Sequence, residues 1–518
     1  MIAATVIGIA LIAALAFMGR RQSLNTHTGW SIGNRGMSSL TTFFLQAGAI
    51  FTSFTFLGMS GLTVLGGVSA TYLPAYLVLG YVGMFLIGPV IWKLGKVFNY
   101  HTNADMAGHQ FRSPLLGKVV AVVCVVFFMP IVQVQIVGLG TMVSFATGNK
   151  SAGTASMVVS TILILLFVAW AGLRGVATVA YFKDVAMVVA LVVVLAGVLV
   201  SYVGDGGIGG VMDQAQELFT VQSGTGTYGI IWFITSVIVS GIGLGAMTLP
   251  ESWPAVLSAN KSRAVSKNHV MLPLYTLATF IPIVIGFYAA RYVVVGDGEE
   301  NSAILSLAAD SLPGWLMGCV LIAGISCAIV PAAHCVLSIA TLISSNLVPA
   351  STSDHRQLTV GRMAAGLVLL LSLGLSLARP DLMANLYLLT YAGLTQLAPV
   401  NILSCTRTTR VNATGLLSGL TVGVVIVIVC TFSGISVWGI NPGVLGLLAN
   451  IAVVVMVSAA TPTTSRPEVP ERLSPRAVRG FPPVSPGSAG SAPSSYSSRY
   501  RASRSRSTSP SEVQPDVE

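Results

Sequence analysis

The sequence predicts an all-α, polytopic membrane protein with about 13 transmembrane helices. Of its 518 residues, 54% are hydrophobic and only 8% are charged, and the mean hydropathy is +0.81. Soluble proteins contain about 25% charged residues. Many apolar runs are also about 20 residues long, which is enough for a helix to cross the hydrocarbon core of a bilayer.

Hydropathy places these spans in order along the chain. The first shows neither a basic segment before it nor a small-residue cleavage site after it, so we expect a retained helix rather than a signal peptide. The thirteen predicted spans are residues 2–19, 39–66, 71–95, 117–146, 153–172, 183–203, 228–250, 270–292, 315–347, 360–378, 382–403, 411–432 and 439–459.

Basic residues predict the orientation. With the N-terminus outside, the inner loops hold 16 of the 27 lysines and arginines, including Arg174 and Lys183, and the tail holds eight more. Positive charge on inner loops is typical of membrane proteins. The net charge of +10 therefore reflects membrane topology and does not indicate nucleic-acid binding. We expect a multi-pass protein of the plasma membrane whose tail, residues 461–518, is disordered and cytoplasmic, because it is rich in Ser, Pro and Arg.

The second span has the composition of a broken helix. Its sequence "QAGAIFTSFTFLGMSGLTVLGG" is crowded with glycines and small hydroxyl residues. Thr52, Ser53, Thr55 and Ser60 are candidates for binding an ion or a solute, because discontinuous helices form such sites near the membrane midplane. Close packing of helices uses the same residue types, so both interpretations remain open.

The seventh span repeats this feature five spans later. Gly241, Gly243 and Gly245 alternate in "SVIVSGIGLGAMTLPESW", so an uninterrupted helix is doubtful. Two breaks five spans apart predict two inverted five-helix repeats, about 39–203 and 228–403, within a ten-helix core over 39–405. Residues 1–38 would then add a helix and a loop, and residues 406–460 would add two more helices.

Polar residues in two other spans are further candidates. Gln133 and Gln135 project to different sides of a helix, and either a ligand or a buried structural role suits Gln135. In "CAIVPAAHC" of the ninth span, Cys327, Pro331 and His334 share one helix face. Pro331 has no N–H group, so the carbonyl of Cys327 loses its helical partner and is available to a cation or water. His334 is a candidate proton carrier, with a neutral structural histidine as the alternative.

Together these segments resemble the sodium:solute symporter family, and its monocarboxylate-permease-like branch in particular. The resemblance covers residues 30–405. The motifs that carry it are "FTFLGMSG", "QIVGLG", "YFKDVAMVV", "MTLPESWPAVLSANKSRAVSKNHVMLPLY", "AIVPAAHCVLSIATLISSN" and "GLTQLAPV". The resemblance implies a LeuT-like fold and cation-coupled symport of a small organic solute by alternating access. An enzyme is not expected, because the chain has no HExxH, GxSxG or Walker motif.

The resemblance also implies an ion site. It assigns carbonyl ligands to Gly48, Phe51 and Cys327, adds the aspartate Asp184, and leaves the Thr52 hydroxyl nearby. Two positions where the family has hydroxyl side chains are Val330 and Pro331 here, so part of that sodium site is missing. The coupling ion is therefore predicted to be Na⁺ or H⁺, with His334 or Asp184 as the proton carrier in the second case. No other metal and no cofactor is expected.

The same branch implies a short monocarboxylate as the solute. An anion would be bound by hydroxyl and amide groups of Ser53, Thr55, Gln135 and Ser240 and by exposed N–H groups at Gly241 and Gly243. A neutral or zwitterionic solute is the alternative. A membrane sensor is a weaker alternative, because the tail has no hydrophobic period with which to build an output domain. We expect no partner other than the solute and the lipid bilayer.

Overall fold

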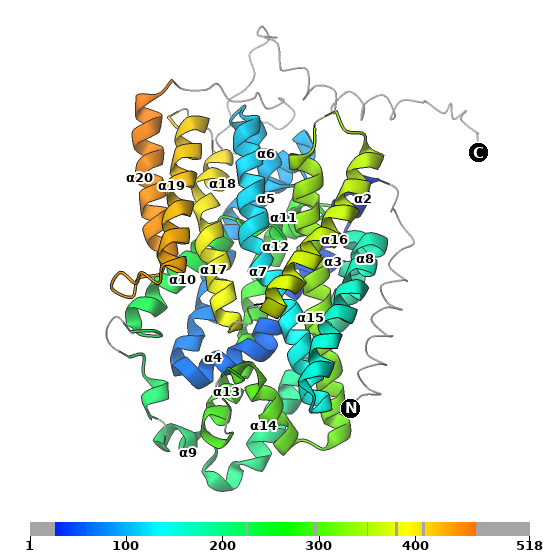
Figure 1. The fold of residues 1–518 in the computed structure, drawn as a ribbon, viewed down its shortest axis with the longest axis vertical. Coiled ribbons are helices and arrows are strands. Elements are labelled where there is room, and N and C mark those ends of the chain that lie inside the picture. Colours follow the sequence, from blue (N-terminus) through cyan, green and yellow to red (C-terminus); the bar gives the residue numbers. More distant parts are fainter. Residues whose placement is uncertain are drawn as a thin grey trace, which may run out of the picture.

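The computed structural model describes residues 26–462, apart from 215, 223–225, 294–295, 297, 350, 379–381 and 407–409. Helices make up almost all of this part of the chain (Figure 1). The predicted first span and the C-terminal tail lie outside the described residues. The long helices are α5 (Tyr72–Phe98), α7 (Pro114–Thr147), α8 (Lys150–Ser201), α15 (Gly314–Leu342), α16 (Asp354–Ala378), α19 (Ala413–Phe432) and α20 (Pro442–Ala460).

Shorter helices complete the other predicted spans. Within the described part of the chain, nine helical segments are long and apolar enough to cross a membrane, and two shorter apolar helices, α3 and α10, accompany them. The shorter membrane helices are α3 (Ser39–Ile50), α4 (Met59–Gly66), α10 (Ile230–Gly245), α11 (Ser252–Leu257), α12 (Ser262–Thr276), α13 (Phe280–Tyr292), α17 (Met383–Leu394) and α18 (Ala398–Ser404). The remaining helices are α2 (His27–Ile32), α6 (Asn103–Gln110), α9 (Gly207–Gln214) and α14 (Ala303–Ser311).

The second span is broken, as its composition predicts. Helix α3 ends at Ile50, Phe51 has an extended backbone, and a π-helical turn over Phe54–Gly58 leads into α4. A π-helical turn at such a place often marks a functional site. The break leaves carbonyl and N–H groups in the interior of the protein without helical partners, and side chains of other helices must satisfy them.

The seventh span is also broken, but the break follows the glycines instead of containing them. Helix α10 continues through Gly241, Gly243 and Gly245, and the break covers Ala246–Glu251, with Met247 at a φ of 52°. The glycines serve packing instead of a break. A Cβ atom on Gly83 of α5 would lie 2.6 Å from the Cα atom of Gly245, so the two helices touch backbone to backbone.

The fifth and sixth predicted spans form one long element, α8, with a sharp bend. Gly172 has φ 55° and ψ −164°, a backbone conformation that favours glycine. The bend needs no loop, so the prediction of an inner loop carrying Arg174 and Lys183 is wrong. The helix resumes directly after Gly172, and Lys183 lies about three turns into its second half, fully buried.

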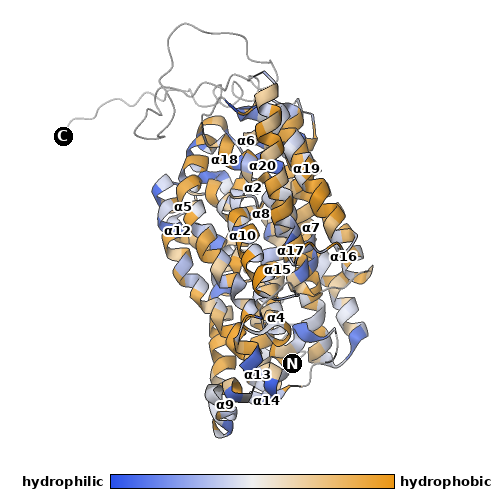
Figure 2. Ribbon diagram, turned by 90° about the vertical axis from the view of Figure 1, so that its left-hand side faces the viewer, coloured by the Kyte–Doolittle hydropathy of each residue, from blue (hydrophilic) through white to orange (hydrophobic). Residues whose placement is uncertain are grey.

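Helix α15 forms the centre of the bundle. It packs against α7 and α8, and nearly every residue from Val320 to Leu342 is buried. Pro331 does not interrupt it. Helices α19 and α20 pack on each other at one edge of the molecule, beside α17 (Figure 1). Hydrophobic residues dominate the helices along most of their length (Figure 2), as expected for a protein whose outer surface faces lipid.

Candidate functional site

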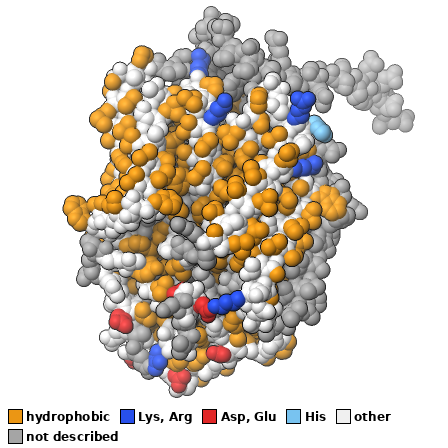
Figure 3. All heavy atoms as spheres, viewed as in Figure 1, with side chains coloured by type: hydrophobic (Ala, Val, Ile, Leu, Met, Phe, Trp, Pro, Cys, Tyr) orange, Lys and Arg blue, Asp and Glu red, His pale blue; other side chains and the backbone are white. Residues whose placement is uncertain are grey.

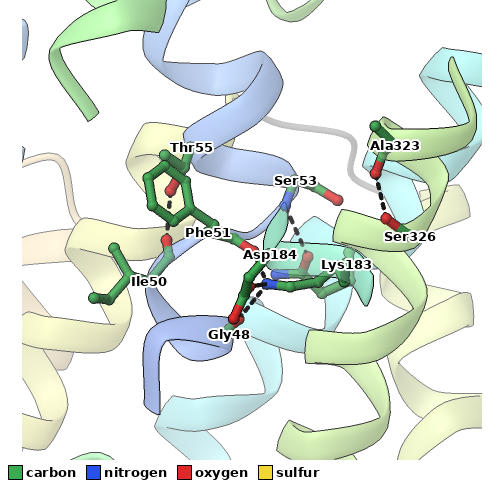
Figure 4. Close-up of polar contacts among 10 residues, drawn as sticks. Gly48, Ile50, Phe51, Ser53, Thr55, Lys183, Asp184, Ala323 and Ser326 are labelled. Carbon is green, nitrogen blue, oxygen red and sulfur yellow. Dashed lines mark hydrogen bonds and ion pairs between the residues drawn. The ribbon is translucent and has the colours of Figure 1, made fainter. Parts of the chain in front are cut away.

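The break in the second span encloses a lysine. The ammonium group of Lys183, on α8, donates hydrogen bonds to the carbonyl oxygens of Gly48 at 2.9 Å and Phe51 at 2.7 Å. Its third contact is an ion pair with Asp184, with 2.7 Å between Nζ and Oδ1. Figure 4 shows the ammonium between these three oxygens. Both charged side chains are completely inaccessible to solvent.

This cluster contains three of the predicted ion ligands. The carbonyls of Gly48 and Phe51 and the carboxylate of Asp184 converge, but the cation among them belongs to Lys183. All three N–H donors of a lysine ammonium are accounted for by these contacts, and the carbonyl of Cys327 is not among them. Neither carboxylate oxygen of Asp184 has a hydrogen-bond partner within the described part of the chain, so the ion pair with Lys183 is the contact that compensates its charge.

The other polar groups of the break hold its shape. The backbone N–H of Ser53 donates to Oε1 of Gln135 at 3.1 Å, so this glutamine satisfies an N–H group that the break leaves free. The Thr52 hydroxyl bonds the Tyr387 hydroxyl at 2.8 Å. The Thr55 hydroxyl donates to the carbonyl of Ile50 at 2.6 Å. Of the predicted ion ligands, Thr52 therefore bonds α17 instead of the group around Lys183.

Two candidates from α15 stand apart from these contacts. Cys327 and His334 are both buried, and Nε2 of His334 has no hydrogen-bond partner within the described residues. The hydroxyl of Ser326, which precedes Cys327 in the sequence, donates back to the carbonyl of Ala323 in its own helix at 2.6 Å (Figure 4). The roles predicted for Cys327 and His334 stay predictions.

A small cavity of about 40 Å³ lies between the two breaks. This volume holds about three water-sized groups. Polar side chains from several elements reach its wall, and no lysine or arginine is among the lining residues. These side chains are Gln46 of α3, Thr55 of the π turn, Tyr76 and Tyr81 of α5, Glu251 and Ser252 at the second break, and Tyr387 and Tyr391 of α17.

Few of the predicted solute ligands reach this cavity. Thr55 lines it, whereas Ser53, Gln135, Ser240, Gly241 and Gly243 do not. The exposed N–H groups expected around Ser240–Gly245 are absent from this segment, because these residues belong to regular helix. The cavity wall comes instead from Leu244, Leu249 and Glu251, at the end of α10 and in the true break.

Sequence reasoning missed Lys183, Glu251 and the four tyrosines. Lys183 could have been identified from the two adjacent charged residues in the apolar stretch "AYFKDVAMVV". Charged side chains within a membrane span cost free energy unless they are paired, so two adjacent opposite charges indicate a buried ion pair. Glu251 follows a proline in "TLPESW", a typical helix boundary. The tyrosines are scattered over α5 and α17, and only tertiary packing brings them to one cavity.

Several known proteins are similar to this chain. It is 28% identical over 452 residues to "Uncharacterized symporter YhjB" of Bacillus subtilis, covering 83% of this chain and 91% of the relative. It is 27% identical over 483 residues to a "Monocarboxylate transport permease protein" of Rhizobium johnstonii, covering 87% and 95% of the two chains.

Solved structures show the same fold. The structure matches that of a Na⁺-coupled sialic acid symporter with a TM-score of 0.73 at 14% identity, covering 90% of this chain and 98% of that one. It matches Mhp1, a nucleobase-cation-symport-1 family transporter, with a TM-score of 0.52 at 15% identity, covering 85% and 97%. The LeuT-like fold expected from the sequence is thereby confirmed. The family model of the sodium:solute symporters matches residues 30–423. Because this match covers most of the chain, the chain belongs to the sodium:solute symporter family.

Proposed function

We propose that this cation-coupled symporter carries a short monocarboxylate by alternating access. The observation that carries the proposal is the cavity at the two breaks, which is small and has the hydroxyl and amide side chains of Gln46, Tyr387 and Tyr391 in its wall. Such groups can hydrogen-bond a carboxylate, and the apolar residues between them suit a short alkyl chain. The Rhizobium relative named as a monocarboxylate permease supports the same solute class.

One residue of the cavity favours the alternative, a neutral or zwitterionic solute. Glu251 lines the wall and is 8% exposed, and its Oε2 atom has no hydrogen-bond partner within the described residues. An ionised carboxylate at this place would repel an anion and attract an amine. A monocarboxylate therefore requires Glu251 to be protonated when the solute is bound, whereas a zwitterion pairs with its charged form.

The solute is tested by uptake into proteoliposomes. Radiolabelled pyruvate and acetate would be offered with unlabelled propionate or alanine as competitors. We expect saturable uptake that propionate inhibits and alanine does not, and Glu251→Gln should retain it, because the amide keeps the shape of a protonated carboxyl group. Inhibition by alanine, together with loss of transport in Glu251→Gln, would favour the zwitterion.

We also propose that the N-terminus is outside and that the loops rich in lysine and arginine are cytoplasmic. On the face in Figure 3, most lysines and arginines lie toward the end opposite the acidic residues, with a broad apolar surface between them. This separation agrees with positive charge on the inner side of the membrane. The plasma membrane is the location that fits such a symporter.

A further inference from the structure

The cavity wall contains a polar atom that can only accept a hydrogen bond. Oε1 of Gln46, on α3, is buried and has no hydrogen-bond partner within the described residues, and the side chain is 6% exposed. The hydroxyls of two other wall residues are already used, because Thr55 bonds the Ile50 carbonyl and Tyr387 bonds Thr52. An amide oxygen that stays buried without a donor costs free energy.

His269 of α12 determines which end of this amide remains free. Its Nε2 atom lies 3.0 Å from Nε2 of Gln46. An amide nitrogen can only donate, so Nε2 of His269 is the acceptor. His269 is buried, its ring stacks on Tyr81, and it does not itself line the cavity. It is therefore a positioning residue, which holds the nitrogen end of Gln46 and leaves the oxygen end without a partner.

We propose that Gln46 recognises a hydroxyl group on the solute, so that the transported monocarboxylate is a 2-hydroxy acid. This inference rests on the proposed transport of a short monocarboxylate and specifies its class. An ionised carboxylate offers only acceptors, so acetate and propionate cannot satisfy Oε1 of Gln46. A hydroxyl beside the carboxylate supplies the missing donor, and the carboxylate remains free to bond other groups of the wall.

The size of the cavity determines where the hydroxyl must be. The cavity of about 40 Å³ holds about three water-sized groups. A solute of two or three carbons fills it and leaves no room for a water that would bond Oε1 of Gln46 instead. In a solute of two carbons, the carbon next to the carboxylate is the only one that can carry a hydroxyl.

Glu251 is the other wall residue with a buried atom that has no partner within the described residues. Its carboxyl oxygen can accept the same hydroxyl, and its ionised form would favour an ammonium group. The two residues belong to different elements, Gln46 to α3 and Glu251 to the second break. Substitution of Gln46 and competition by alanine therefore separate their contributions.

The first test compares solutes that differ only in the hydroxyl. Uptake of radiolabelled lactate, with radiolabelled acetate in parallel, would be measured in proteoliposomes of the full-length protein. Inward sodium and proton gradients would be applied together, so that the result does not depend on the coupling ion. The unlabelled competitors are two pairs, glycolate with acetate and lactate with propionate. We expect the hydroxy acid of each pair to inhibit at a concentration about tenfold lower or less, because the other acid leaves a buried acceptor unsatisfied.

The second test changes Gln46 and His269. Gln46→Met removes the amide oxygen, and the preference for the hydroxy acids should disappear. His269→Leu should weaken the preference, because the amide is then free to turn. His269→Gln should retain it, because the new amide oxygen can accept from Nε2 of Gln46. A general loss of stability would lower uptake of both acids of a pair and would leave their ratio unchanged.

The matched control is Gln133→Met. Gln133 is a buried glutamine of α7 that does not line the cavity, so its variant should keep the wild-type preference. The comparison of the two pairs of acids in the wild type needs no variant, so it decides even if Gln46→Met does not fold.

Equal inhibition by both acids of each pair in the wild type would overturn the inference, and so would a wild-type preference in Gln46→Met. Stronger inhibition by alanine than by lactate would overturn it too, because the donor would then be an ammonium group. If neither labelled lactate nor labelled acetate is taken up, the proposed function fails together with this inference. If both are taken up with equal affinity, the inference alone fails.

Discussion

At the scale of single residues, the Lys183–Asp184 pair is the most consequential feature. Charges buried without solvent are costly unless each has partners, and removing one member of a buried pair typically costs about 3–5 kcal/mol. Here Lys183 has two carbonyl partners in addition to Asp184, whereas Asp184 depends on Lys183. The two members of the pair are therefore not equivalent.

We predict that Lys183→Met destabilises the protein more than Asp184→Asn does. Lys183→Met leaves an unpaired carboxylate and two unsatisfied carbonyls, and its cost should be about 3 kcal/mol or more. The double variant should be less destabilised than the sum of the single ones, because each removes the same ion pair. Unfolding midpoints of the four proteins in one detergent measure this. Additive losses would mean that the two side chains do not interact.

A second residue-scale feature lies outside the membrane helices. His109 of α6 is partly buried, its ring packs on Phe98, and Nδ1 lies 2.5 Å from the Tyr100 hydroxyl. Burial, together with the charge of Arg112, lowers the pKa of His109 from 6.5 to about 4. The folded protein thus favours the neutral imidazole, and the unfolded chain binds a proton more readily.

We predict that stability falls as the pH decreases from 6.5 toward 4. The contribution of His109 is fully present above pH 6.5 and is lost as the pH falls through this window, because unfolding then takes up a proton. His109→Gln should make the dependence of the unfolding midpoint on pH shallower. His355→Gln, at an exposed site of α16, is the control and should not. Equal slopes for His109→Gln and the wild type would contradict the prediction.

At the scale of elements, the bend of α8 depends on one glycine. A Cβ atom on Gly172 would lie 3.0 Å from the Trp30 carbonyl oxygen and 3.1 Å from its indole ring. The indole N–H donates to the Val168 carbonyl at 2.9 Å, so α2 is fastened to α8 at this bend. The bend therefore determines the direction of the second half of α8, on which Lys183 lies. It also determines the position of α2.

We predict that Gly172→Ala destabilises the protein by about 1–3 kcal/mol, because alanine is strained at this φ and ψ. Transport should fall as well, since Lys183 and Asp184 follow on the same element. The control is Gly374→Ala in α16, where the space around an added Cβ is open and alanine favours the helix. Unfolding midpoints and uptake rates are the measurements. Similar behaviour of both variants would show that the bend tolerates alanine.

At the scale of the whole molecule, the separation of charge predicts the orientation in the membrane. A variant whose six native cysteines are replaced by alanine would carry one new cysteine at a time, at Lys261 or at Asp213. Both sites are exposed. We expect a membrane-impermeant maleimide added to intact cells to label Asp213→Cys only, and Lys261→Cys to react after the membrane is opened. The reverse pattern would invert the proposed topology.

The sequence by itself determined the class of the protein and much of its architecture. Composition and the length of the apolar runs predict the helices, and each predicted span within the described residues corresponds to helical segments of the structure. The break in the second span was predictable, because small and hydroxyl residues crowd it. The break in the seventh was misplaced, because glycines at 241–245 equally serve close packing of α10 on α5.

Tertiary structure alone decided what occupies the ion site and what lines the cavity. Lys183 looked like a loop residue, because a bend that depends on one glycine φ angle cannot be read from hydropathy. Gly48 and Lys183 are 135 residues apart, and their contact follows from how α8 crosses the broken span. The cavity is likewise lined by helices that are distant in sequence. Local sequence patterns predict where helices form and which of their faces are buried, but they do not show which helices meet.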